Sequence, residues 1–241
     1  MQLIIISDIH GNLSALTSVL EDIRTRHNPN AIALLGDFID YGMRSDEVIE
    51  IIRALNYPIL CNIWGNHEMA VMNEDYNHFS SKRGVESAKY TRRKLVEDSL
   101  LYLKEVEGKA GFQEFTFCNQ KYLAVHGSLE DPYWKVISPN SDLHGYEKYD
   151  YVLSGHSHYP HVFSVFYSVE DPALRNKKRT VFINPGSVGQ PRNHDPRAQY
   201  AVLDSEKGIE LCSVNYDIEF EQSLFTEEID VFYRDRLSRG I

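Results

Sequence analysis

Near its start the chain reads Gln2-Leu-Ile-Ile-Ile-Ser-Asp-Ile-His-Gly-Asn12, an apolar run followed directly by polar residues. Residues 3–6 are uniformly apolar and too few for a helix, which predicts a β-strand buried on both faces. Asp8 and His10 follow this strand, and in a strand-like conformation residues two apart point the same way. A carboxylate and an imidazole held together at a strand end suit a divalent metal ion.

A turn and a helix follow this first strand. After Gly11 and Asn12, apolar residues recur at helical spacing, namely Leu13, Leu16, Val19, Leu20 and Ile23. The strand end therefore faces a helix start, which is where open α/β sheets bind their ligands. We expect Asn12 to fix the turn after Gly11, and contact with a substrate is the alternative.

The composition is that of a globular protein. The 241 residues are 42% hydrophobic and 25% charged, which predicts one domain over residues 1–241. No run approaches the roughly 18 apolar residues of a membrane span, and the start of the chain lacks the features of a signal peptide. We therefore expect a cytoplasmic protein with no membrane partner.

The charge excludes one class of partner and leaves another open. A formal net charge of −10 counts against a nucleic-acid surface, because such surfaces neutralise phosphates with Lys and Arg. A small phosphate ester could still bind, because bound metal ions would supply positive charge that this count omits.

Polar side chains also follow the next two predicted strands. Asp37 comes after residues 31–35, and Asn66 comes after residues 59–64. Asp8, Asp37 and Asn66 are each 29 residues apart, close to the length of a βα unit. The residues alone thus predict a mostly parallel α/β sheet with polar groups at its strand ends.

The second half of the chain repeats this arrangement. His126 ends a predicted hairpin of residues 115–117 and 122–125, and His156 and His158 follow a strand at residues 150–153. Further strands are predicted at residues 162–169, 180–183, 200–203 and 209–214, and residues 220–241 are predicted to be irregular chain followed by a terminal helix. Arg192 lies in a loop rich in Gly and Pro at another strand end.

A helical, charged segment of about residues 69–111 interrupts the pattern. Its apolar positions alternate with a basic flank that includes Arg92 and Arg93. One interpretation is a pair of solvated surface helices. The other is a cap beside the active site that presents Arg92 or Arg93 to an anionic substrate.

The strand-end clusters contain five of the ten histidines, together with Asp and Asn. The full set is Asp8, His10, Asp37, Asn66, His67, His126, His156 and His158. So many N and O donors can hold two metal ions, with Asp37 as the natural bridge. The absence of thiolates favours Mn, Fe, Zn or Ni over a structural cysteine-type zinc site.

Five ordered motifs in this sequence resemble the calcineurin-like metallophosphoesterase family. They are Asp8-x-His10, Gly36-Asp37-x-x-Asp40, Gly65-Asn66-His67-Glu68, Val125-His126-Gly127 and Gly155-His156-Ser157-His158. The His-Gly-Asn continuation after Asp8 and the loop that ends in Arg192 are similar to a small prokaryotic branch of single-domain members.

The resemblance implies a fold and a set of site residues. The fold would be a sandwich of two mixed β-sheets flanked by helices. Two divalent or mixed-valence transition-metal ions would be bound, one by Asp8, His10, Asp37 and His158, and the other by Asp37, Asn66, His126 and His156. His67 would stand beside the ions without binding them, and Asp40 would orient His67 or the loop.

The activity that follows is hydrolysis of phosphomonoesters or phosphodiesters by a metal-activated hydroxide. His67 would protonate the departing oxygen or stabilise its charge. Arg192 could contact the phosphate, although a structural salt bridge explains Arg192 equally well. A protein Ser/Thr phosphatase and a dinucleoside polyphosphate hydrolase are alternatives in the same family. The acidic charge counts against a nuclease. A non-catalytic scaffold is disfavoured because every expected position is filled.

Overall fold

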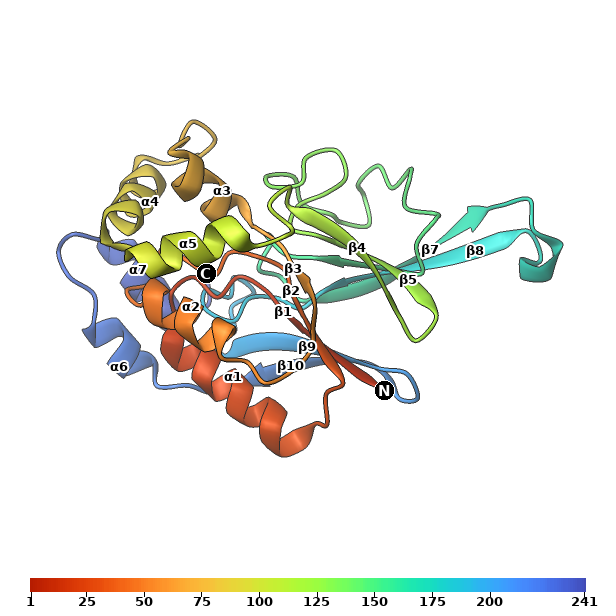
Figure 1. Cartoon of the computed structure of the whole chain (residues 1–241), viewed down its shortest axis with the longest axis horizontal. Coiled ribbons are helices and arrows are strands. Elements are labelled where there is room, and N and C mark those ends of the chain that lie inside the picture. Colours follow the sequence, from red (N-terminus) through yellow and green to blue (C-terminus); the bar gives the residue numbers. More distant parts are fainter.

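A computed structural model describes all 241 residues and shows two five-stranded β-sheets packed against each other (Figure 1). In spatial order the first sheet comprises β10 (Gly208–Val214), β9 (Ala198–Asp204), β1 (Gln2–Ile6), β2 (Ala31–Leu34) and β3 (Ile59–Asn62). The second comprises β4 (Phe112–Phe117), β5 (Gln120–Val125), β6 (Tyr151–Ser154), β8 (Lys177–Asn184) and β7 (His161–Ser168). Each sheet has three parallel neighbouring strands, β1–β2–β3 or β5–β6–β8, extended by antiparallel pairs.

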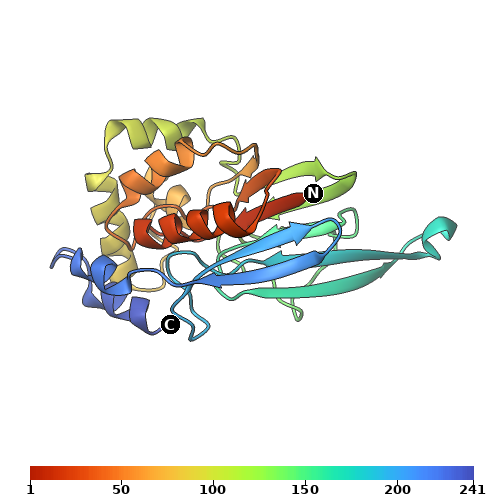
Figure 2. The ribbon, with the colours of Figure 1, turned by 90° about the horizontal axis from the view of Figure 1, so that it is seen from below.

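The helices gather at one end of the molecule and over the outer face of the first sheet (Figure 1). They are α1 (Leu13–Arg26), α2 (Ser45–Arg53), α3 (Asn66–Asn73), α4 (Lys82–Lys94), α5 (Glu97–Glu105), α6 (Ile218–Ser223) and α7 (Val231–Asp235). Two short 3-10 turns, Pro172–Leu174 and Arg236–Ser238, complete the elements. The β7–β8 hairpin extends well beyond the rest of the sandwich (Figure 2).

Strand β1 shows why its sequence is apolar at every position. Leu3 and Ile5 point into the core between the two sheets, whereas Ile4 and Ile6 pack against the helices on the other side. A strand covered on both faces needs no polar alternation, as the sequence predicted. The outer face of the second sheet has a different cover, because residues 127–150, which contain no helix, pack Ile137, Tyr146 and Tyr149 against it.

The α/β class and the sandwich of two mixed sheets flanked by helices are confirmed. The single, mostly parallel sheet expected from the residues alone is wrong, because the parallel strands divide into two groups of three, one in each sheet. Repeating βα units with polar strand ends look the same whether they continue one sheet or begin another.

The segment of about residues 69–111 is helical, but it contains parts of three helices instead of two, and the first of these already begins at Asn66. The expected terminal helix is two short helices, α6 and α7. None of the helices has the length and apolar character needed to cross a bilayer. The single domain and the cytoplasmic location stay predictions.

Candidate metal centre

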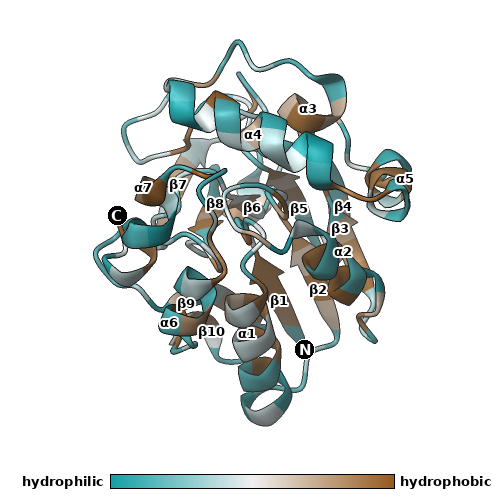
Figure 3. Ribbon diagram, turned by 90° about the vertical axis from the view of Figure 1, so that its left-hand side faces the viewer, coloured by the Kyte–Doolittle hydropathy of each residue, from teal (hydrophilic) through white to brown (hydrophobic).

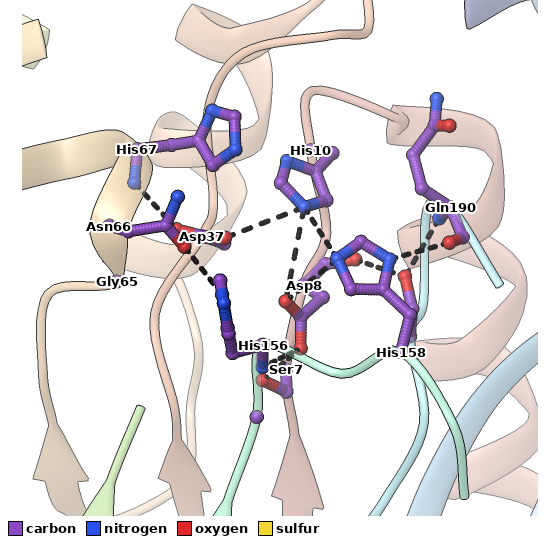
Figure 4. Close-up of polar contacts among 12 residues, drawn as sticks. Ser7, Asp8, His10, Asp37, Gly65, Asn66, His67, His156, His158 and Gln190 are labelled. Atoms are coloured by element: carbon purple, nitrogen blue, oxygen red, sulfur yellow. Dashed lines mark hydrogen bonds and ion pairs between the residues drawn. The ribbon is translucent and has the colours of Figure 1, made fainter. Parts of the chain in front are cut away.

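The candidate ligands lie just after the carboxyl ends of five strands, in the connecting loops or, for Asn66, at the first residue of α3. Asp8 and His10 follow β1, Asp37 follows β2, Asn66 follows β3, His126 follows β5, and His156 and His158 follow β6. The carboxyl ends of parallel strands meet at one edge of a sheet, and here strands of both sheets run in the same direction toward the site (Figure 4). All seven side chains therefore converge, and every one except His156 is almost completely buried.

The backbone at these positions is not strand-like. Asp8, His10 and Asp37 have φ values of 56°, 49° and 54°, and His156 and His158 have 63° and 58°. Strand β1 ends at Ile6, so the expected strand-like pairing of Asp8 with His10 is wrong, although both side chains do enter the same site. Non-glycine residues in the left-handed region cost about 1–3 kcal/mol each and cluster at functional sites.

Four of the ligand candidates form a first group around Asp8. The Nε2 atoms of His10 and His158 are 3.2 Å apart, and His158 Nε2 is 3.2 Å from Asp8 Oδ1. His10 Nε2 also lies 3.6 Å from Asp37 Oδ2 (Figure 4). Two imidazole nitrogens and two carboxylate oxygens thus face one point.

A second group shares Asp37 with the first. His126 Nε2 is 3.3 Å from Asp37 Oδ2 and 3.0 Å from Asn66 Oδ1. His156 Nδ1 is 2.8 Å from the same Asn66 oxygen. Asp37 Oδ2 therefore lies between a nitrogen of the first group and a nitrogen of the second.

The tautomers of the four histidines follow from their backbone partners. In each of the four histidines, the ring nitrogen that points away from the cluster lies next to a backbone carbonyl oxygen. In the first group, His10 Nδ1 is 3.2 Å from Ile39 O and His158 Nδ1 is 2.6 Å from Gln190 O. In the second group, His126 Nδ1 is 2.7 Å from Leu35 O and His156 Nε2 is 3.1 Å from Trp134 O. A carbonyl can only accept, so each of these nitrogens carries the hydrogen. The other nitrogen of each neutral ring presents a lone pair to the cluster, the arrangement that a metal-binding histidine requires.

Each of the two carboxylates, Asp8 and Asp37, also uses one oxygen for hydrogen bonds and directs the other toward the cluster. Asp8 Oδ2 accepts hydrogen bonds from Ser7 Oγ at 2.6 Å and His156 N at 3.2 Å, whereas Asp8 Oδ1 is buried with no hydrogen-bond partner. Asp37 Oδ1 accepts from His67 N at 2.9 Å, and its Oδ2 faces the histidines. Lone pairs that converge without donors repel each other, and a cation between them removes that repulsion, so the residues present fit two metal ions.

The charges at the site agree with this fit. Burial lowers the pKa of His158 to about 4 and that of His156 to about 3, so both rings are neutral ligands at neutral pH. Burial also disfavours the charged form of His126, but the Asp37 carboxylate outweighs it and raises the pKa of His126 to about 9. Positive charge is thus favoured beside Asp37, and a cation can supply it in place of the proton.

Glu68 holds the loops after β2 and β3 together. Its buried carboxylate accepts the N–H groups of Asp37 and Gly65, both at 2.8 Å, and those of Phe38 and Ile39 at 2.7 and 3.2 Å. Burial and the Asp37 charge raise the pKa of Glu68 to about 7, against the effect of these donors. A Cβ atom at Gly65 would lie 2.1 Å from Asp37 Oδ1, which explains the glycine before Asn66.

His67 stands beside the two groups without joining either. Its Nδ1 lies 2.7 Å from Asp40 Oδ2, and its ring packs edge-on against Tyr41 and Phe79 at centroid distances of 4.4 and 5.2 Å. Burial disfavours protonation, but the Asp37 and Asp40 carboxylates outweigh it and raise the pKa of His67. The ring is therefore oriented by Asp40 and lies 4.8 Å from the His10 ring.

Comparison with known sequences identifies the family. The sequence model described as the calcineurin-like phosphoesterase superfamily domain matches residues 1–208. The chain belongs to the calcineurin-like phosphoesterase superfamily. Membership makes it a hydrolase of phosphoric esters.

The similarity to individual proteins extends over almost the whole of this phosphoesterase. It is 32% identical over 221 residues to an uncharacterized protein of Methanocaldococcus jannaschii, a match that covers 89% of this chain and 87% of that protein. A metallophosphoesterase from Sphaerobacter thermophilus has a similar structure, with a TM-score of 0.72, 28% identity and coverage of 100% and 99% of the two chains. A hypothetical protein from Pyrococcus horikoshii shares the fold, with a TM-score of 0.76, 20% identity and coverage of 100% and 98%.

The candidate substrate residues of the phosphoesterase take different places. Asn12 is buried and fully engaged: Oδ1 caps α1 through Ala15 N at 3.0 Å, and Nδ2 donates to Gly189 O at 3.0 Å. Both polar atoms of the Asn12 side chain thus bond within the protein, and Asn12 is not proposed as a substrate contact. Arg192 lies next to His158, whose carbonyl accepts its N–H at 3.4 Å, and the Arg192 guanidinium makes no salt bridge, with its Nε buried and unpaired.

The two arginines of α4 form no hydrogen bond or ion pair with the ligand groups. Arg92 Nε is 3.5 Å from Glu74 Oε1, and Arg93 is exposed and forms no ion pair. The buried face of α4 instead carries Ser87 and Thr91, whose hydroxyls reach Asp40.

Sequence reasoning missed three residues that shape this site. Ser87 and Thr91 have no motif, so no signal pointed to them. Glu68 had one, because Glu three residues after a helix-capping position often accepts the N–H of that position, as Glu68 does from Gly65.

Proposed function

We propose that this chain is a dinuclear metal-dependent phosphoesterase that hydrolyses phosphomonoesters or phosphodiesters. One observation carries the proposal: Asp37 Oδ2 lies 3.6 Å from a His10 nitrogen of the first group and 3.3 Å from a His126 nitrogen of the second. A carboxylate oxygen shared in this way is the bridge that a two-metal site needs.

Each group would hold one ion. The first would be bound by Asp8, His10, Asp37 and His158, and the second by Asp37, Asn66, His126 and His156. The mixed N and O donors suit Mn, Fe, Zn or Ni. Two bound cations would lower the pKa of a nucleophilic water and neutralise the phosphoryl oxygens during in-line displacement.

The remaining residues act on the substrate. His67 protonates the departing oxygen through Nε2, because its Nδ1 is engaged by Asp40. Arg192 contacts phosphoryl oxygens through its guanidinium, which has no carboxylate partner in the protein and can form a two-pronged contact.

A metal analysis combined with a substrate panel tests the proposal. Wild-type protein should hold two transition-metal ions per chain and hydrolyse at least one of a set of monoesters, diesters, nucleotides and phosphopeptides. Asp37→Asn should lose both ions and the activity, whereas Asp98→Asn, a matched change at an exposed position of α5, should lose neither. Full two-ion occupancy in Asp37→Asn would refute the shared carboxylate.

A further inference from the structure

The Asp40 carboxylate is held by more partners than its contact with His67 requires. Oδ2 faces His67 Nδ1 at 2.7 Å. Oδ1 accepts three hydrogen bonds, from Tyr41 N at 2.7 Å, Ser87 Oγ at 2.5 Å and Thr91 Oγ1 at 2.9 Å. Asp40 is completely buried, so no water competes for these positions.

Ser87 and Thr91 come from a part of the chain that is remote from every motif. They are one helical turn apart on α4, which places their hydroxyls on the same face of the helix. Their exposed fractions are only 2% and 4%, although the α4 ribbon is mostly hydrophilic and crosses the helical end of the molecule (Figure 3). The buried face of this helix thus presents hydroxyl groups to one carboxylate oxygen.

The two oxygens of Asp40 have different partners, and this fixes the plane of the carboxylate. A carboxylate bound through a single oxygen can rotate about its last side-chain bond, because that torsion is broad. Three donors on Oδ1 remove this freedom and leave Oδ2 for His67 alone. Asp40 then holds the His67 imidazole in one tautomer and one orientation, as the hydrogen-bond partners of functional histidines commonly do.

We propose that Ser87 and Thr91 are positioning residues for leaving-group protonation, which they control by fixing Asp40 and, through it, the His67 ring. This inference rests on the proposed function, because it assumes that His67 is the general acid. It gives α4 a place in the chemistry that does not depend on its exposed arginines.

The test compares two leaving groups in a set of variants. A stable phenolate needs little protonation and an alkoxide needs much, so loss of a well-placed acid slows alkyl phosphates more than p-nitrophenyl phosphate. Ser87→Ala combined with Thr91→Val should retain two metal ions and lose about 10–100-fold more rate on the alkyl substrate than on the aryl one, under single-turnover conditions. When Thr91→Ser, which keeps the hydroxyl, replaces Thr91→Val in this combination, most of the lost rate should return. Glu86→Ala, on the exposed face of α4, should cause no leaving-group-selective loss of rate.

A double-mutant cycle with His67→Asn separates the possible failures. In the His67→Asn background the α4 changes should cause no further leaving-group-selective loss, because the acid they position is gone. Equal losses of His67→Asn on both substrates would overturn the acid role of His67 itself. A selective loss in His67→Asn, together with an unselective or additive loss in the α4 variant, would overturn the positioning role alone. If the double change prevents folding, Thr91→Val by itself provides the same comparison, because valine has nearly the volume of threonine.

Discussion

The cluster of candidate metal ligands and the His67–Asp40 pair adjoin each other, yet the protein orients them by different means. The four cluster histidines all donate their outer N–H to backbone carbonyls, such as those of Leu35 and Ile39. The His67–Asp40 pair is oriented mainly by side chains, because two of the three donors to Asp40 Oδ1 are hydroxyls from α4 and only one is a backbone N–H, that of Tyr41. Backbone carbonyls are supplied by any residue in the correct conformation, whereas a hydroxyl depends on the residue type. The cluster should therefore tolerate changes in the residues that support it, and the pair should not.

The largest expected effects come from the cluster ligands. His158→Ala removes a donor from the first group and His126→Ala removes one from the second, so each variant should keep only about one ion per chain. Losing one of two ions removes several kcal/mol of transition-state stabilisation, which corresponds to at least about 10³-fold in rate. Elemental analysis and kcat/KM measure both quantities.

A matched control tests the backbone half of the comparison. Gln190 supplies its carbonyl to His158 Nδ1, while its side-chain amide has no hydrogen-bond partner. Gln190→Leu should therefore keep both ions, because the carbonyl is unchanged. Loss of an ion in this variant would show that the supporting side chain matters in the cluster as well.

The same difference explains what could be foreseen from the sequence. Asp8, Asp37 and the cluster histidines were recognisable because each lies at a strand end in an ordered motif, with spacings close to 30 residues. Their left-handed backbone was not foreseen, since spacing says nothing about φ, and the division into two sheets came only from the family resemblance. Ser87 and Thr91 escaped because a small polar residue on a helix normally satisfies its own backbone. Tertiary contact alone gives them a role.

The next prediction concerns the pair itself. His67→Asn should keep both ions, because His67 belongs to neither ligand group. It should lose up to about 10²–10⁴-fold on alkyl phosphates and much less on p-nitrophenyl esters. Single-turnover rates on both substrates, with metal content measured in parallel, check this. A loss of metal would instead make His67 a ligand.

Glu68 should show an intermediate effect, on stability more than on chemistry. Glu68→Gln places an amide NH2 where one carboxylate oxygen accepts two backbone N–H groups, which leaves those donors buried and unpaired. Removing the charge also relieves part of the repulsion with Asp37, which offsets some of the cost of the unpaired donors. We expect a net loss of about 2–4 kcal/mol in the free energy of unfolding. Denaturant midpoints of the metal-free protein measure it, with exposed Glu74→Gln as the control. Equal midpoints for the two variants would contradict the role of Glu68 in joining the loops.

The smallest effect is expected on the outer side of α4, where the comparison can be drawn within one helix. Arg92 pairs with Glu74 and Arg93 is exposed, while Thr91, next to them in sequence, is buried against Asp40. Because exposed ion pairs contribute little, Arg92→Ala combined with Arg93→Ala should change unfolding free energy by no more than about 1 kcal/mol. KM for anionic substrates should stay within about twofold, since neither guanidinium contacts the ligand groups and exposed charges are screened by salt. A clear rise in KM at unchanged metal content would show that α4 presents these arginines to substrate after all, and the helix would then serve the site with both its faces.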